Sequence, residues 1–207
     1  MLRLTHLSLI VAAIVLPASL LHAALQGPDK TPARGSLAGQ LLVASPALGD
    51  PRFSRTVIVM VRHDRNGAMG IVINRPAQER TLASLLAALG EKDAAVEGSV
   101  RIFVGGPVQP DRGFVLHSAD YQRPETMRID GQVAVTSTRA ILHDMAKNEG
   151  PKKSLVAFGY AGWGPGQLEG ELTLKAWFVA APDAQLVFDA DRDKVWDDAM
   201  KRRTQEL

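Results

Sequence analysis

The segment formed by residues 63–76, HDRNGAMGIVINRP, constrains the fold of this chain more than any other. Apolar, strand-like sequence stands on both sides of a short polar interruption that contains Asn66 and Gly67. Asn-Gly is the dipeptide that best tolerates the positive φ angles of a tight hairpin turn. The sequence therefore predicts a hairpin at the centre of a sheet, with His63 and Asn74 at the points where its strands end.

The residues before this hairpin also read as part of a sheet. Residues 56–61 (TVIVMV) are apolar at consecutive positions, which is typical of a strand buried on both faces. A short strand over residues 40–44 precedes them, followed by a turn over 46–51 in which the Asp50 carboxylate can cap the next turn. We expect Phe53 to anchor this loop to the core.

The remainder of the chain mixes helix and strand signals. Thr81 precedes leucines at helical spacing as an N-cap, Gly90 ends that helix, and Asp130-Gly131 indicates a second hairpin. The other predicted elements are strands at 100–104, 113–117, 154–159 and 185–188, and helices from a Ser137 or Thr138 cap to Gly150, over about 166–177, and at the C-terminus. Hairpins dominate over strand-helix-strand units, so we expect an α+β or mixed-sheet domain.

The first 23 residues form a separate segment. Arg3 precedes an apolar run over residues 7–21, and the small residues Ala23 and Ala24 follow it, as in a secretory signal with cleavage near Ala23. The run is shorter than the roughly 20 apolar residues of a spanning helix. We expect a periplasmic or secreted protein with a flexible leader over residues 24–38 and a folded domain over 39–207. A retained anchor in the inner membrane is the alternative, because Leu21 stands where cleavage prefers a smaller side chain.

Composition narrows the possible functions. A chain of 207 residues, 46% of them hydrophobic, suits one substantial core. The formal charge of +2 leaves no basic stripe, which argues against nucleic-acid binding. The chain has no cysteine, so disulfides, thiolate nucleophiles and cysteine-ligated metals are excluded.

Four segments, taken in order, resemble the YqgE/AlgH-like family. They are residues 39–53 (GQLLVASPALGDPRF), 63–76, 105–117 (GGPVQPDRGFVLH) and 158–171 (FGYAGWGPGQLEGE). The resemblance implies a single domain with strongly bent mixed sheets flanked by helices. Proteins of the family carry labels such as uncharacterised protein or transcriptional regulator, and the resemblance supplies no catalytic residue set. Family members typically lack a signal, so the N-terminus of this chain argues against a role in transcription.

His63, Asp64 and His117 form a candidate metal set. Two imidazoles and one carboxylate can hold a divalent ion or supply a general base, which would make the chain a metal-assisted hydrolase. The sequence offers no i, i+4 spacing that would bring these groups together. We therefore favour a structural interpretation, in which the two imidazoles form hydrogen bonds at strand ends.

Residues 162–166 (GWGPG) form the second candidate site. Their backbone N–H groups, placed before a predicted helix, could face a phosphate or carboxylate. Gln167 and Leu168 stand where a P-loop needs Lys followed by Ser or Thr, so this is not a nucleotide motif. We prefer a structural interpretation, a turn that needs positive φ angles with Trp163 packed over it.

The leading hypothesis from the sequence is an exported, non-enzymatic accessory domain that binds a small ligand or a protein partner. We expect no catalytic residues, no cofactor and no resident metal, no nucleic-acid partner if the protein is exported, and no stable membrane span once the signal is cleaved. The alternatives are a transcriptional regulator, from the family label, and a metal-assisted hydrolase. The candidate ligand-binding residues, expected to meet at a common rim, are His63, Asn74, Gly105, Gly106, His117, Gly162, Trp163 and Gly164.

Overall fold

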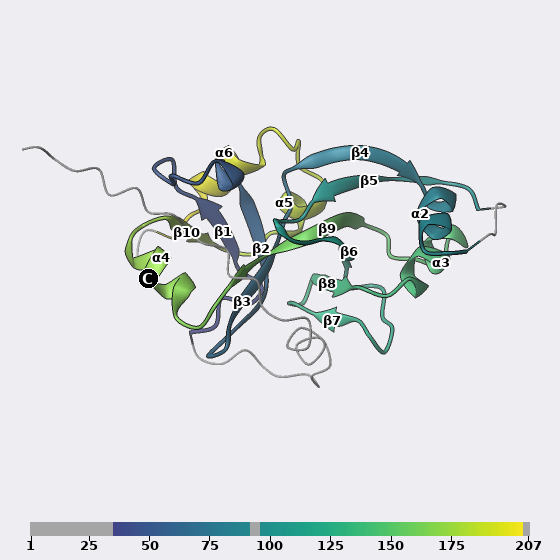
Figure 1. Cartoon of the computed structure of the whole chain (residues 1–207), viewed down its shortest axis with the longest axis horizontal. Helices are drawn as coiled ribbons and strands as arrows, with labels where there is room; N and C mark the ends of the chain where they lie inside the picture. The colour runs from purple at the N-terminus through teal and green to yellow at the C-terminus, as the bar shows by residue number, and fades with distance from the viewer. Residues whose placement is uncertain (1–34, 92–95, 205–207) are drawn as a thin grey trace, which may run out of the picture.

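The computed structural model describes residues 35–91 and 96–204, which form one branched sheet with flanking helices (Figure 1). The predicted signal and the first part of the leader lie outside the described residues. The strands are β1 (Leu41–Ala44), β2 (Val57–Asp64), β3 (Gly67–Val72), β4 (Pro76–Thr81), β5 (Ser99–Val104), β6 (Val108–Ser118), β7 (Met127–Arg128), β8 (Val133–Thr136), β9 (Ser154–Trp163) and β10 (Trp177–Ala180). The helices are the short 3₁₀ turn η1 (Pro51–Phe53) and α2 (Leu82–Ala88), α3 (Ala140–Ala146), α4 (Gln167–Thr173), α5 (Ala184–Phe188) and α6 (Val195–Lys201).

The predicted central hairpin is confirmed as β2 and β3. Its two-residue turn is Arg65 and Asn66, and Asp64 pairs with Gly67 across it. Gly67 has a positive φ of 121°, and a Cβ there would lie 2.2 Å from the Trp163 carbonyl oxygen. Glycine is required at this position for both reasons, because the hairpin and the end of β9 approach each other backbone to backbone.

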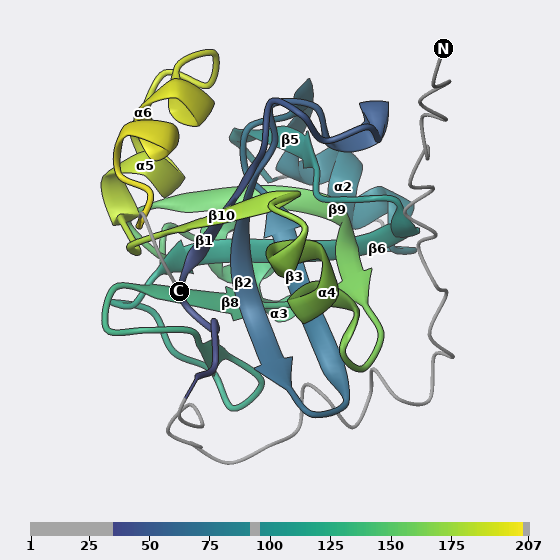
Figure 2. The ribbon, with the colours of Figure 1, turned by 90° about the vertical axis from the view of Figure 1, so that its left-hand side faces the viewer.

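Strand β9 is the junction of the sheet. The strands follow the order β10-β1-β2-β3-β9-β6-β8-β7, and β5, which also pairs with β4, joins β9 in parallel. β3 pairs with the C-terminal end of β9, around Ala161, while β5 pairs with its N-terminal half, around Ala157. In Figure 2, β2 and β3 run steeply across the direction of β6 and β9, so the sheet is strongly curled. The predicted fold class, a mixed α+β domain with bent sheets, is confirmed.

The curled sheet is covered on both faces. The concave face carries residues such as Val59, Ile71 and Leu116, and Val187 and Trp196 of α5 and α6 pack against it. The opposite face of β1, β2 and β3 packs under α4. A third cluster joins α2 and α3 to β5. Burial on both faces explains why residues 56–61 are apolar at consecutive positions, as predicted.

Other local predictions are confirmed. Thr81 caps α2 by accepting a hydrogen bond from the Ser84 N–H at 3.1 Å. Asp130 accepts from the Gln132 and Val133 N–H groups in the second hairpin. Phe53 is buried and contacts Trp177 edge to face, with ring centroids 5.5 Å apart. The cap and the second hairpin were predictable because each depends on residues close together in sequence.

The predictions for residues 166–188 were partly wrong. The expected helix over 166–177 ends at Thr173, and Trp177 begins β10, where it pairs with Ala44. Lys175 reverses the chain with a positive φ of 55°. The expected strand over 185–188 is helix α5, because Asp183 accepts hydrogen bonds from the N–H groups of Gln185 and Leu186 in its first turn. A strong N-cap outweighed the strand-like composition of this short apolar run.

The two ends of α3 and the presence of strand β4 also differ from the predictions. Neither Ser137 nor Thr138 caps α3; its N-cap is Arg139, without a side-chain hydrogen bond. The helix ends at Ala146, before Gly150. Residues 76–81, which were not predicted as a strand, form the fully exposed β4. An exposed strand with Pro, Gln, Glu and Arg carries no hydrophobic period, so its pairing with β5 was not visible in the sequence.

Two further observations concern where the predicted leader meets the folded domain and whether the described part of the chain holds a membrane-spanning helix. Leu37 is 7% exposed and packs in the cluster under α4, so this residue of the predicted leader already belongs to the folded domain that was expected from Gly39. No helix within the described residues is long and apolar enough to cross a membrane.

Candidate functional site

His63 lies at the end of β2 and is held on both ring nitrogens. Nδ1 accepts a hydrogen bond from the Leu37 N–H at 3.0 Å, so the proton of the neutral ring sits on Nε2, which contacts Glu169 Oε1 at 2.9 Å. The pKa of Glu169 is lowered by a hydrogen bond from the backbone N–H of Glu169 and by one from His63. Asp64 turns elsewhere, to the Asn66 N–H and to Arg62. The imidazole thus joins the predicted leader, the hairpin and α4.

Trp163 lies two strands from this histidine, across Ala68 of β3, and belongs to a buried polar cluster that the sequence did not predict. Glu171 is 6% exposed and accepts hydrogen bonds from the indole N–H groups of Trp163 and Trp177, at 2.9 and 2.7 Å. Gln167 donates to its second oxygen at 2.9 Å. The two indole rings stand edge to face, 5.8 Å apart. This cluster fastens α4 to the sheet and uses both oxygens of the carboxylate.

Of the glycine-rich residues 162–166, the first two end β9 and the last two form a turn into α4. The Gly164 N–H donates to Gln167 Oε1 at 3.0 Å, and Gly166 has a positive φ of 72°. Gly162 is paired with Met69 inside the sheet. The N–H group that a bound anion would use is therefore already occupied by a side chain of α4.

Gly105 and Gly106 serve the close approach of three backbones. A Cβ on Gly105 would lie 2.3 Å from the carbonyl oxygen of Gly159, and one on Gly106 would lie 2.1 Å from the carbonyl carbon of Tyr160. Gly105 also accepts from the Val72 N–H at 2.9 Å and donates to the Phe158 carbonyl. These glycines hold β3, β5 and β9 together at the branch of the sheet.

Asn74 closes the open end of the hairpin. Its side-chain oxygen accepts from the Val57 N–H at 2.9 Å, and its side-chain nitrogen donates to the Arg55 carbonyl at 2.8 Å. Both contacts are with backbone groups, as expected for a residue that fixes a strand exit.

His117 is fully buried near the C-terminal end of β6. Its Nε2 contacts Thr136 Oγ1 at 2.9 Å, and its Nδ1 donates to the Ser118 carbonyl. Burial lowers the pKa of His117, opposed by the Ser118 contact and the charge of Asp120. The ring packs edge to face on Tyr121 at 5.2 Å. A neutral, structural imidazole accounts for every one of these contacts.

A buried carboxylate next to His117 fastens the 119–126 loop to α3. Asp144 is 4% exposed, accepts from Tyr121 Oη at 2.5 Å and forms a two-point ion pair with Arg123. Burial would raise the pKa of Asp144, but the hydrogen bonds from Arg123 and Tyr121 outweigh it, so the pKa is lowered. No sequence motif predicts the contacts of Asp144, because its partners come from a loop more than 20 residues earlier in the chain.

The sheet register separates His63 from His117. His63 pairs with Ala68, which pairs with Trp163, whereas His117 pairs with Ser154 at the other end of β9. Nine residues of strand at about 3.3 Å each correspond to roughly 30 Å. The common rim expected for the candidate residues is therefore not formed: His63 and Trp163 lie at one end of β9, Gly105 and Gly106 near its middle, and His117 at the other end. Among the residues that the structure describes, no cluster of three His, Asp or Glu could hold a metal ion.

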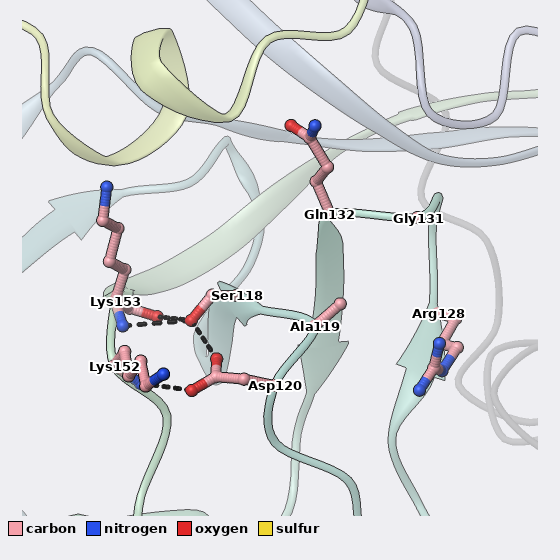
Figure 3. A pocket seen from close by; sticks show the side chains of 8 residues that line it. All are labelled: Ser118, Ala119, Asp120, Arg128, Gly131, Gln132, Lys152 and Lys153. Carbon is pink, nitrogen blue, oxygen red and sulfur yellow. Dashed lines mark hydrogen bonds between the residues drawn. The ribbon is translucent and has the colours of Figure 1, made fainter.

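One cleft of about 360 Å³ lies where β6 ends and β9 begins (Figure 3). We call it the β6–β9 cleft; its lining residues are Ser118, Ala119, Asp120, Arg128, Gly131, Gln132, Lys152 and Lys153. Ser118 Oγ donates to Asp120 and accepts from the Lys153 N–H at 3.1 Å, and the other Asp120 oxygen accepts from the Lys152 N–H at 3.2 Å. These contacts tie the end of β6 to the start of β9 and fix the floor of the cleft.

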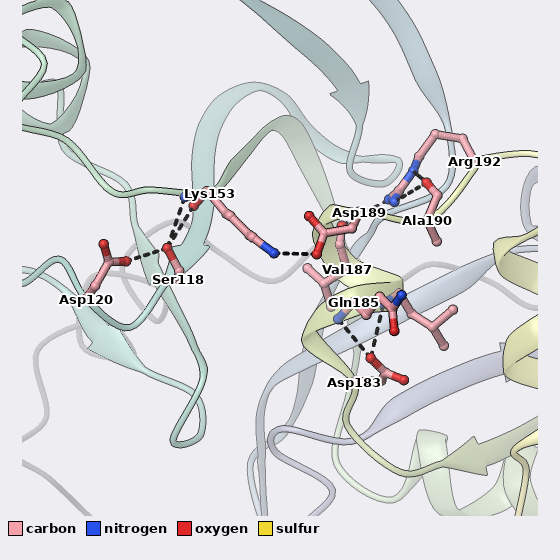
Figure 4. A network of polar contacts seen from close by, with 10 residues as sticks. Ser118, Asp120, Lys153, Asp183, Gln185, Val187, Asp189, Ala190 and Arg192 are labelled. Carbon is pink, nitrogen blue, oxygen red and sulfur yellow. Dashed lines mark hydrogen bonds and ion pairs between the residues drawn. The ribbon is translucent and has the colours of Figure 1, made fainter.

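The charge in this cleft is predominantly positive. The hydrogen bond from Ser118 lowers the pKa of Asp120, which stays ionised. Lys153 reaches away from the cleft to an ion pair with Asp189, beside α5 (Figure 4). Lys152 and Arg128 form no ion pair with any residue in the described part of the chain. Two cationic side chains without an ion pair thus line a cleft whose one carboxylate already accepts hydrogen bonds on both oxygens, and a third cation, Lys153, lies at its edge.

Comparison with known proteins places the chain in a family. The profile of the AlgH-like family matches residues 41–207. The chain belongs to the AlgH-like family. A UPF0301 protein of Rhodospirillum rubrum is 46% identical over 161 residues, which cover 77% of this chain and 84% of the relative. A UPF0301 protein of Caulobacter vibrioides is 44% identical over 168 residues, covering 80% of this chain and 86% of the relative.

Solved structures of AlgH-like shape agree with this assignment. The solution structure of the AlgH protein from Pseudomonas aeruginosa has a TM-score of 0.70 and 37% identity, covering 84% of this chain and 92% of that one. A crystal structure of a protein from Corynebacterium diphtheriae has a TM-score of 0.63 at 20% identity, over 89% of this chain and 93% of that one. The second likeness shows the fold alone. None of these names states an activity, so function is argued from the geometry.

Proposed function

We propose that this AlgH-like chain is an exported, non-enzymatic domain that binds an acidic segment of a partner protein in the β6–β9 cleft. One observation carries the proposal: Arg128, Lys152 and Lys153 line an open depression whose single carboxylate, Asp120, is already hydrogen-bonded. Because backbone and hydroxyl groups hold Asp120 in place, its carboxylate cannot move to form an ion pair with each cation in turn. A carboxylate of a bound ligand can form these ion pairs.

The ion pair of Lys153 is weak enough to exchange. The side chains of Lys153 and Asp189 are 51% and 42% exposed. Exposed pairs of this kind contribute about 0–1 kcal/mol, so a ligand carboxylate can compete for the ammonium group. Lys153 can then turn from α5 toward the cleft and add a third positive charge to the site.

The openness of the cleft favours a chain segment over an enclosed small molecule. Its cations are exposed and stand on flexible stems, and its two apolar lining residues, Ala119 and Gly131, are too small to enclose a ligand. Small-molecule sites are usually concave and mostly apolar. Exposed basic rims instead govern the rate and selectivity of docking between charged proteins.

The chemistry around Ser118 supports a binding role. A nucleophilic hydroxyl needs an adjacent general base such as histidine or lysine. Ser118 Oγ contacts Asp120 and the Lys153 backbone, while the Lys153 amine points to Asp189. His117, the next residue in the chain, is buried and contacts Thr136 instead. This arrangement suits a hydroxyl that organises a loop.

Export is proposed from the sequence of residues 1–23. The test is a C-terminal fusion to an alkaline phosphatase that is active only outside the cytoplasm, with mass spectrometry of the mature N-terminus. We expect an active fusion and a chain that begins at Ala24. A full-length, inactive fusion would overturn the export part and restore the transcriptional alternative.

Binding is tested by fluorescence anisotropy with a labelled hexaglutamate peptide and the purified protein. We expect binding that weakens with added salt, and about fivefold to tenfold weaker binding for Lys152→Glu and for Arg128→Glu. The matched control is Arg80→Glu, which makes the same charge reversal on the exposed strand β4. Equal affinity for all three variants would show that only net charge matters and would refute the cleft as the site.

A further inference from the structure

Tyr160 on β9 carries a buried hydroxyl without a partner. The residue is 1% exposed, and its hydroxyl has no hydrogen bond to any group that the structure describes. Its ring packs edge to face on Phe114, with centroids 6.1 Å apart, and a Cβ on Gly162 would lie 3.1 Å from Tyr160 Cε2. Native proteins seldom leave a buried polar group unpaired, so this hydroxyl calls for an explanation.

Arg62 provides a second unpaired donor on the same face of the sheet. Arg62 pairs with Met69, and Met69 pairs with Gly162, two residues from Tyr160. Side chains of directly paired residues share a face, and so do residues two apart in a strand. The Arg62 Nε is buried and has no partner among the described residues, while its Nη1 contacts Asp64 at 3.3 Å. The side chain of Arg62 is 22% exposed, so part of it reaches solvent although its Nε is buried.

Arg112 brings a second guanidinium close to Tyr160, through the Phe114 ring that both contact. Residues 109–112 interrupt the register between β6 and β9, between Val108 and Gly113. This leaves the Arg112 guanidinium 5.6 Å from the centre of the Phe114 ring, the ring that also contacts Tyr160. Burial raises the pKa of Tyr160, and the charges of Arg112 and Arg62 oppose that rise, so both cations act on the hydroxyl.

We infer that Arg62, Arg112 and the Tyr160 hydroxyl form a binding site for a phosphate group, free or carried as a monoester. Two guanidinium groups match the charge of a dianion, and donors from three separate side chains suit a tetrahedral group better than a planar one. Asp64 takes part of the charge of Arg62 and limits affinity. This site lies on the hairpin side of the sheet and shares no residue with the β6–β9 cleft.

The test is calorimetric titration of the full chain with inorganic phosphate and, separately, with O-phosphoserine. We expect phosphate to bind, Arg62→Gln to weaken binding at least tenfold, and Tyr160→Phe to weaken it about threefold to tenfold. Arg65→Gln, an exposed arginine three residues along the same hairpin, removes the same charge and should change affinity less than twofold. Asp64→Asn should tighten binding. Phosphoserine binding with the same variant pattern assigns the site to esters as well, and binding of phosphate alone restricts it to the free ion.

A second measurement separates binding from folding. Without phosphate, Tyr160→Phe should leave the unfolding midpoint unchanged or raise it, because it removes a hydroxyl that has no partner. A lowered midpoint would show that the hydroxyl has a structural partner and would overturn the site. So would the absence of phosphate binding at millimolar concentrations, or equal losses for Arg62→Gln and Arg65→Gln.

Discussion

The buried carboxylate of Glu171 offers the sharpest test of how this fold is held together. We predict that Glu171→Ala destabilises the protein by about 3 kcal/mol. The change leaves the indole N–H groups of Trp163 and Trp177 without an acceptor, and both residues are almost fully buried. Each buried donor left unpaired costs about 1–3 kcal/mol, and relief from burying a charge offsets part of the sum.

Glu171→Gln should cost much less, about 1 kcal/mol. Both indole groups donate to the same carboxylate oxygen, Oε2, so one amide oxygen can accept from both. The amide nitrogen then faces the Gln167 amide, which must turn away. The matched control is Glu169→Gln, two residues earlier on α4, whose side chain is 56% exposed. We expect it to stay within about 0.5 kcal/mol of the parent protein.

The assay is urea unfolding followed by far-ultraviolet circular dichroism and by tryptophan fluorescence. Two of the three tryptophans contact Glu171, so fluorescence reports on the altered place directly. The slope of unfolding free energy against urea should stay constant, which would confirm that the native state alone has changed. If the Ala variant lost less than about 1 kcal/mol, or if Ala and Gln cost the same, the indole hydrogen bonds would not be what fastens α4.

Three further predictions follow from single residues. Burial lowers the pKa of His117 in the folded state, so the unfolded chain binds more protons below about pH 6.5 and the free energy of unfolding falls from there toward lower pH. In urea unfolding at pH 7.5 and pH 5, His117→Gln should reduce this pH dependence. An unchanged dependence would contradict the prediction. Gly159→Ala should lower the free energy of unfolding by more than about 2 kcal/mol, because its φ is +74° and the added Cβ would lie 2.3 Å from the Gly106 oxygen. Gly131→Ala, which has open space around it, should leave stability unchanged. Thermal melts of both variants check this pair. Asn74→Ala should cost about 1–2 kcal/mol by leaving the Val57 N–H unpaired, and a melting temperature equal to that of the parent would exclude this.

The parts of the fold that were predictable depend on neighbours in sequence. The hairpin at residues 63–76 and the Thr81 cap are each decided within a few residues, by turn geometry or by a side chain reaching a nearby N–H. The four segments that resemble the YqgE/AlgH-like family also predicted the bent sheet correctly. Where two local signals competed, as at residues 185–188, the period of a short apolar run could not separate helix from strand.

The candidate site was harder to predict because distance along β9 decides it. His63 and His117 are both polar residues at strand ends, and their sequence patterns are equivalent. Only the register, with Trp163 near one and Ser154 beside the other, shows that they stand at opposite ends of the same strand. The β6–β9 cleft went unpredicted for a related reason, since its lysines, its arginine and Asp120 come from three separate segments without a shared motif.

The amino-acid sequence by itself determined the central hairpin, the burial of its first strand on both faces, the family and the class of fold. Tertiary structure alone decided that β9 is the branch point, that Trp177 belongs to a strand, and which charges gather in one place. The physical reason is the range of the interactions. Turns and caps are settled by a few adjacent dihedral angles and hydrogen bonds, whereas strand pairing and the convergence of side chains depend on contacts between residues far apart in the chain.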